Sequence, residues 1–251
     1  MSCLSGNRSN PVMRLCGALI AAACMLGAAH AQPAAHANLH ELGKRLEVGD
    51  VVFIRIPSQP FTQVAETTSS WTNHVGIVSD VSGAEPVIAE SRVPLSGETS
   101  WSDFVKRSES GRVAVMRLGT PLDARQQRKV KQAVAARSGI LYDTGFDLHS
   151  PRQFCSRFVR EVLGEATGVE IGEVETFATL LQRNPQADRR FWRMWYFGEI
   201  PWQRETVTPA SLLRDDRLEA YFDGYADGTA GSWNVGSRES GKSVITTGSI
   251  K

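Results

Sequence analysis

The chain has 251 residues, of which 41% are hydrophobic and 22% are charged, and its formal net charge is +1 at pH 7. These proportions are ordinary for a globular protein, and the near-neutral charge provides no general attraction to nucleic acid or to an anionic membrane. The length suits one domain with additional end segments, or two small domains.

The first 31 residues have the pattern of a secretory signal peptide. Arg8 and Arg14 flank the start of an apolar run at residues 15–29, and residues 29–31 (Ala-His-Ala) match a small-x-small cleavage site. The run is short and rich in alanine and glycine for a spanning helix. We therefore expect an exported, periplasmic protein with no stable membrane insertion after cleavage. An uncleaved anchor and a lipoprotein acylated at Cys24 are the alternatives.

The rest of the chain predicts a flexible segment at residues 32–45, a folded domain at residues 46–220 and a Gly/Ser-rich disordered tail at residues 221–251. Runs of β-branched and aromatic residues indicate strands, and apolar residues spaced three to four apart indicate helices. The predicted strands cover residues 51–56, 74–80, 86–91 and 112–118, and the predicted helices cover residues 101–108, 122–137, 151–163, 176–183 and 209–213. Gly76, inside a strand, indicates close approach of another backbone. The aromatic run at residues 191–197 favours a strand or turn packed over the core, rather than a sugar- or membrane-binding surface.

The helix after residue 150 carries a cysteine near its predicted beginning. Ser150 is a candidate N-cap, Pro151 suits the first helical position, and Gln153 would complete a capping box. Cys155 would then lie close to the positive end of the helix, where a thiolate is favoured.

This cysteine is expected to have no disulfide partner in the mature chain. Cys3, Cys16 and Cys24 all lie before the predicted cleavage site, so Cys155 alone remains. An unpaired cysteine in an exported protein is either a small buried apolar residue or a reactive thiol.

A cysteine nucleophile needs a base and a third group that orients this base. His74 and His149 are the candidate bases, and His74 is favoured because it lies at the end of a predicted strand. A hairpin linking residues 74–80 to residues 86–91 would bring Glu90 near His74, where a carboxylate could fix the imidazole tautomer. The alternative for Glu90 is a surface carboxylate on an edge strand.

Tyr142 is a candidate substrate-binding residue, because it shortly precedes the cysteine helix and its hydroxyl could reach the same cleft; core packing is the alternative. The four mature histidines are too dispersed, with one cysteine, for a structural zinc site. We expect no metal or other cofactor.

Four segments resemble the YiiX/YebB-like permuted papain-like amidases, which are circularly rearranged relatives of the NlpC-type cell-wall peptidases. These segments are residues 46–53 (LEVGDVVF), 73–78 (NHVGIV), 87–95 (VIAESRVPL) and 152–159 (RQFCSRFV). The order His, Glu, Cys is the diagnostic feature, since ordinary papain-like enzymes place the cysteine first. The chain looks closest to the YebB branch, although Asn73 stands where relatives often have serine.

This resemblance implies an α+β, circularly permuted papain-like fold, with a small antiparallel barrel-like sheet packed against the nucleophile helix. It also implies that Cys155 is the nucleophile, His74 the base and Glu90 the orienting residue.

We therefore expect an exported cysteine hydrolase that cleaves an amide bond, in cell-wall peptides or related small amides, through a thioester. A lipid acyl hydrolase or acyltransferase with the same residues is one alternative, which an apolar trough beside Cys155 would favour. A pocket lined by cations would favour peptide. A non-catalytic binding domain of this fold is the other alternative. The expected partner is a small peptide, amide or acyl substrate and no nucleic acid; the sequence leaves the oligomeric state open.

Overall fold

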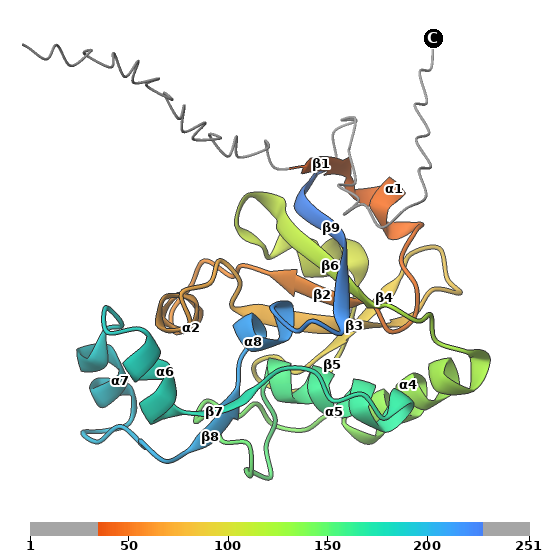
Figure 1. Cartoon of the computed structure of the whole chain (residues 1–251). Coiled ribbons are helices and arrows are strands. Elements are labelled where there is room, and N and C mark those ends of the chain that lie inside the picture. Colours follow the sequence, from red (N-terminus) through yellow and green to blue (C-terminus); the bar gives the residue numbers. More distant parts are fainter. Residues whose placement is uncertain (1–34, 228–251) are drawn as a thin grey trace, which may run out of the picture. The chain divides into compact units, whose positions relative to one another are not determined.

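The computed structural model describes residues 35–227 (Figure 1). The signal peptide predicted at residues 1–31, and residues 228–251 of the predicted tail, lie outside this range. The described residues form a mixed α+β fold in which a seven-stranded sheet lies between helices. None of the helices described is long and apolar enough to cross a membrane.

The main sheet has the strand order β1-β9-β6-β2-β3-β4-β5, and a second sheet pairs β7 with β8. The strands are β1 (Ala35–Asn38), β2 (Val51–Ile54), β3 (His74–Asp80), β4 (Val87–Glu90), β5 (Gly97–Ser100), β6 (Arg112–Leu118), β7 (Val174–Thr176), β8 (Glu205–Val207) and β9 (Leu218–Asp227). All neighbours in the main sheet are antiparallel except β1 and β9, which run parallel. Because β1 and β5 are separate edges, the sheet is open, and the expectation of a barrel-like sheet is wrong.

Helices cover both faces of the sheet, so the sheet has a hydrophobic core on each face rather than one enclosed core. They are α1 (Leu39–Gly43), α2 (Phe61–Thr67), α3 (Trp101–Lys106), the 3₁₀ helix η1 (Glu109–Gly111), α4 (Ala124–Ala136), α5 (Cys155–Thr167), α6 (Phe177–Arg183), α7 (Arg189–Trp195) and α8 (Pro209–Leu213). In β2, Val51 and Phe53 belong to a core shared with α4 and α5, whereas Val52 and Ile54 belong to a core shared with α1 and α3. The two-residue period of a strand therefore supplies two apolar layers, one for each face.

Both ends of the folded domain extend beyond the predicted limits of 46 and 220. Ala35–Asn38 forms β1 and Leu39–Gly43 forms α1, so most of the segment expected to be flexible is regular structure. Strand β9 continues to Asp227, and its second half pairs with β1. The sequence hides β9 because Leu218–Asp227 contains no β-branched residue and includes two aspartates, a glutamate and a glycine. These two strands stabilise each other, so neither is recognisable alone.

The hairpin of β3 and β4 forms as predicted, and its glycine permits a close contact. Ile77 pairs with Ala89 in the antiparallel register. A Cβ added to Gly76 would lie 2.6 Å from a methyl carbon of Ile88 and 2.9 Å from the ring of Phe104. The absence of a side chain at position 76 therefore lets α3 pack closely against the hairpin. The two nearest atoms belong to side chains, and the backbone oxygen of Ala89 follows at 3.1 Å, so the close approach is mainly by side chains rather than by the backbone that the sequence predicts.

Residues 191–195 of the aromatic run are helical rather than a strand or turn, and residues 196–197 lie in the turn that follows. Helix α7 begins after Asp188, whose carboxylate accepts hydrogen bonds from the backbone N–H groups of Arg190 and Phe191. This N-cap outweighs the β preference of the aromatic residues. Trp192 is buried in the core, as expected for packing of this segment against the domain.

Candidate active site

Cys155 is the first residue of α5, further toward the helix N-terminus than the sequence indicates. The N-cap is Phe154, which has an extended backbone and makes no capping hydrogen bond. Ser150 instead accepts a hydrogen bond from the N–H of Arg152 and closes a turn before the helix. The N–H groups at such a helix start have no intrahelical acceptor, so the thiol lies in a favourable field for a negative charge.

Tertiary pairing explains why the predicted cap is wrong. The N–H of Gln153 donates to the carbonyl of Leu141, and the carbonyl of Gln153 accepts from Asp143. The side chain of Gln153 donates to Glu161 rather than reaching back toward Ser150. Residues 151–154 are therefore held in extended and bent conformations, and the helix begins later.

Helix α5 presents Cys155 from a firmly packed base. Phe158, Val159, Val162 and Leu163 are fully buried against the sheet, and Figure 1 shows α5 lying beside α4. The helix passes Gly164 and ends at Thr167, followed by Gly168 in the left-handed region at φ 81°. The thiol position is thus fixed by the same contacts that form the main core.

The hairpin brings His74 and Glu90 into direct contact. His74 opens β3 and Glu90 closes β4, and Nε2 of His74 lies 2.5 Å from Oε2 of Glu90. Both residues are 0% exposed, so Glu90 is not a surface carboxylate. A carboxylate accepts hydrogen bonds, which makes Nε2 the protonated nitrogen and leaves Nδ1 to act as an acceptor.

The free nitrogen of His74 belongs to the same electrostatic cluster as Cys155. Nδ1 is buried and has no hydrogen-bond partner among the described residues. Burial disfavours the charged imidazole, but the charges and hydrogen-bonding capacity of Cys155 and Glu90 outweigh it and raise the pKa of His74 to about 9. An imidazole of this kind is positioned to take the thiol proton.

The pKa of the Cys155 thiol is shifted in the opposite direction to that of His74. Burial alone would raise the pKa of Cys155, but the His74 imidazolium, the backbone N–H of Val75 and the hydroxyl of Tyr142 lower it below its ordinary value. Burial likewise opposes ionisation of Glu90, and His74 and Arg107 reverse this and lower the pKa of the carboxyl. The electrostatics therefore favour a thiolate at Cys155, an imidazolium at His74 and a carboxylate at Glu90, all of them buried.

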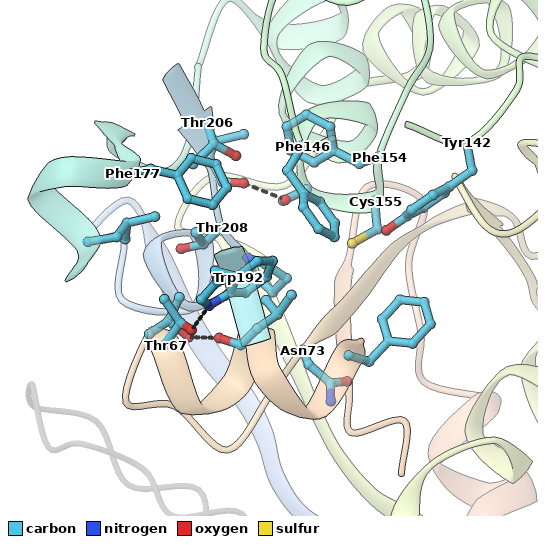
Figure 2. A pocket seen from close by; sticks show the side chains of 17 residues that line it. Thr67, Asn73, Tyr142, Phe146, Phe154, Cys155, Phe177, Trp192, Thr206 and Thr208 are labelled. Carbon is cyan, nitrogen blue, oxygen red and sulfur yellow. Dashed lines mark hydrogen bonds between the residues drawn. The ribbon is translucent and has the colours of Figure 1, made fainter. Parts of the chain in front are cut away.

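Tyr142 lies beside the sulfur of Cys155, with its hydroxyl oxygen directed toward it (Figure 2). The residue is buried, and burial together with the charge of Cys155 raises the pKa of Tyr142 well above its ordinary value. Its hydroxyl makes no regular hydrogen bond with any described residue. A neutral O–H donor is thus available next to the thiol.

His149, the other candidate base, lies away from this cluster. Its side chain is 72% exposed, and its Nε2 lies 2.7 Å from a carboxylate oxygen of Glu205 on the surface. The structure therefore brings together Cys155, His74, Glu90 and Tyr142, and separates His149 from them.

A pocket opens beside Cys155 (Figure 2). Its walls are mainly aromatic and aliphatic, and include Phe61, Phe146, Phe177, Leu180, Trp192 and Val207. No charged side chain is among the described residues that line it. The indole N–H of Trp192 is satisfied inside this wall, because it donates to the hydroxyl of Thr67 at 2.7 Å.

Residues 45–222 match the family model of the permuted papain-like amidase enzymes, YaeF/YiiX, C92 family. This chain belongs to the permuted papain-like amidase family. Membership confirms the resemblance inferred from the sequence and supports a cysteine hydrolase of the amidase type. The placement nearest to the YebB branch stays a prediction.

Two similar proteins agree with this assignment. The uncharacterized protein YiiX of Escherichia coli strain K12 is 25% identical over 172 residues, which cover 68% of this chain and 84% of that protein. A crystal structure of YiiX from Escherichia coli O157:H7 has a TM-score of 0.66 and 24% identity, covering 71% of this chain and 98% of the other. The second likeness shows the fold.

The crystal structure of YiiX is titled as that of a metalloprotein. Across residues 35–227 of this amidase-family chain, no group of three or more His, Cys, Asp or Glu side chains could hold a metal ion. The described residues therefore do not fit such a centre, and we assign no chemical step to a metal.

Several contributors to the site are not recognisable from the sequence. Arg107 contacts Glu90 from the end of α3, and Phe146 and Trp192 line the pocket from distant segments. Arg107 is the C-cap residue of α3, inside the range predicted to be helical, but nothing local indicates which way its side chain turns. Phe146 has a positive φ of 52°, which a phenylalanine rarely adopts and which no sequence pattern announces.

Proposed function

We propose that this protein is a cysteine amidase in which Cys155 is the nucleophile, His74 the base and Glu90 the orienting residue. The observation that supports it most directly is the position of Cys155, a free cysteine at the start of α5, next to a buried His–Glu pair. A structural cysteine needs none of these neighbours, whereas a nucleophile needs all of them.

In the proposed reaction, the Cys155 thiolate attacks the amide carbonyl carbon, and the carbonyl electron pair moves to oxygen. The backbone N–H of Cys155 and the hydroxyl of Tyr142 would stabilise this oxyanion. The imidazolium of His74 then gives its proton to the leaving amine, and a thioester remains on Cys155. His74, now neutral, removes a proton from water, which attacks the thioester and releases the carboxylic acid and the thiolate.

The pocket bears on the substrate class. Its walls carry no charged side chain among the described residues, so they offer no counter-charge to the carboxylates and amines of cell-wall peptides. They suit an apolar acyl group instead. Our first candidate for the natural reaction is cleavage of cell-wall peptides or related small amides. Our second candidate is hydrolysis or transfer of a lipid acyl group by the same residues, and the uncharged pocket favours this second candidate.

Export to the periplasm is also a proposal, supported by the signal-peptide pattern of residues 1–31. Both substrate classes are available in that compartment. Fractionation of cells that produce the full chain, combined with mass determination of the mature protein, would test the export and the cleavage position.

One labelling experiment tests the nucleophile and the base together. In the chain from residue 32 onward, which retains Cys155 alone among the cysteines, a thiol-directed acylating probe should label the wild-type protein at Cys155. The Cys155→Ala variant should take no label, and His74→Ala should be labelled slowly. His149→Ala is the matched control and should be labelled at the wild-type rate. Persistent labelling of Cys155→Ala would overturn the assignment of the nucleophile.

Product analysis then separates the substrate classes. The wild-type protein is incubated with a peptidoglycan digest and with a series of N-acyl amides of increasing chain length, and the products are identified by mass spectrometry against Cys155→Ala. Release of peptide fragments supports the first candidate, and release of fatty acids supports the second. Labelling at Cys155 without turnover of either set would favour a non-catalytic binding domain.

A further inference from the structure

Glu90 has a second charged partner on the side away from His74. Its Oε2 faces His74, and its Oε1 accepts a hydrogen bond from Nη2 of Arg107 at 2.7 Å. Arg92 is nearer in the sequence, yet its Nε lies 3.7 Å from the same oxygen and its side chain is 45% exposed. Arg107 is therefore the closer of the two cations.

Arg107 is held in place by the ring that also packs against His74. It is the C-cap residue of α3, and its guanidinium lies 5.0 Å from the centroid of the Phe104 ring. This buried ring also lies beside the imidazole of His74, at 5.8 Å between centroids. One aromatic ring thus supports both partners of Glu90, and the space left by Gly76 admits it.

A buried carboxylate with one bound oxygen can still rotate, and it can also become neutral. With a partner on each oxygen, both its orientation and its charge are fixed. The charged and titratable groups around Glu90 are His74 from β3, Arg107 from the end of α3, Arg92 from the segment after β4, and Cys155 from α5 beyond the imidazole.

We propose that Arg107 is a positioning residue of this site, which holds Glu90 ionised and oriented so that His74 presents Nδ1 to Cys155. This inference rests on the proposed function, since it adds Arg107 as a positioning residue to the proposed catalytic residues Cys155, His74 and Glu90. It assigns Arg107 a role through Glu90 alone, with no contact to substrate.

The direction of the effect follows from the charges. Arg107 is one of the groups that lower the pKa of Glu90. Without it, Glu90 binds a proton at higher pH, and His74 loses its counter-charge there. The imidazolium–thiolate pair then forms only at higher pH. The acid limb of the pH profile, where the reaction rate of the Cys155 thiol falls as the pH is lowered, therefore moves toward neutral pH.

Alkylation of Cys155 by iodoacetamide measures this limb without any substrate. The rate is followed from pH 4 to pH 9 by peptide mass spectrometry, which resolves Cys155 from the other cysteines of the full chain. For Arg107→Gln we expect the acid limb to move up by about one pH unit, which is a tenfold lower rate on that limb. Arg107→Lys should restore part of the shift, and Arg92→Gln is the matched control, with little or none.

A variant cycle separates positioning from general destabilisation. If Arg107 acts through Glu90, adding Arg107→Gln to Glu90→Gln should leave the alkylation profile of Glu90→Gln unchanged. Thermal melting of each variant shows whether it is folded. If Arg107→Gln alone is unstable, the comparison of Glu90→Gln with the double variant still tests whether Arg107 acts through Glu90. An unmoved acid limb in folded Arg107→Gln, or an equal shift in the Glu90→Gln background, would overturn the inference. Failure of the proposed function would instead appear as absent turnover by a wild-type protein whose alkylation profile is as described.

Discussion

The charge of Glu90 should control the pH at which His74 loses its proton. In the structure the pKa of His74 rises from an ordinary 6.5 to about 9, against the opposing effect of burial. This difference corresponds to about 3 kcal/mol in favour of the imidazolium. Cys155 raises the pKa of His74 more than Glu90 does, so Glu90→Gln removes the smaller of the two contributions. An opposite charge at contact distance shifts a pKa by about 1 to 2 pH units.

For Glu90→Gln we therefore expect the titration midpoint of His74 to fall by about 1 to 2 pH units. The sign follows from the raised pKa, because the stabilised imidazolium is present at low pH and is lost as the pH rises through about 9. In the proposed reaction the imidazolium protonates the leaving amine, so the alkaline limb of hydrolysis should move down with the titration midpoint of His74.

Ring resonances of ¹³C-labelled histidine, followed from pH 5 to pH 10, measure this midpoint directly. Glu205→Gln is the matched control, because it removes the carboxylate partner of the exposed His149 and should leave His74 unchanged. If the His74 midpoint stays at its wild-type position in folded Glu90→Gln, the carboxylate does not stabilise the imidazolium and this account of the site is refuted.

Three further predictions concern the oxyanion, the packing and the domain limits. Tyr142→Phe removes one donor beside the thiol and should lower kcat by about 10²-fold with a much smaller effect on KM, as read from steady-state kinetics; an unchanged kcat would exclude the hydroxyl from the oxyanion site. Gly76→Ala overpacks the contact with Phe104 and should cost about 1–3 kcal/mol of unfolding free energy in urea titrations, whereas Gly97→Ala, which meets no atom within 4 Å, should cost much less. A chain that ends at residue 220 lacks the part of β9 that pairs with β1 and should lose its cooperative thermal transition; retention of that transition would show that the outer strands are dispensable.

The sequence predicts those parts of the fold and site that depend on local pattern. The alternation in residues 74–80 and 86–91 places His74 and Glu90 at one end of a hairpin, and the structure joins them. The run at residues 209–213, with Thr208 as cap, is helical as expected. In each of these cases the residues that decide the structure lie within one or two elements of each other.

The sequence fails where distant partners decide the outcome. The capping pattern after Ser150 is a sound local signal, but pairing of Gln153 with Leu141 and Asp143 displaces the start of α5. Strand β9 is polar on its exposed positions and becomes a strand through β6 and β1. The contact of Arg107 with Glu90 depends on how α3 packs over the hairpin, which no periodicity in the sequence encodes.

The wide separation of the thiol from its base has a consequence for the newly made chain. Glu90 and His74 are 16 residues apart and can meet once their hairpin forms, whereas Cys155 arrives only when α5 packs against the sheet. Before that step Cys155 is an ordinary thiol, largely protonated at neutral pH and without a general base. Under the proposed function, activation of Cys155 therefore requires α5 to be packed against the sheet, and a chain held unfolded by a chaperone carries no activated thiol that could attack its surroundings.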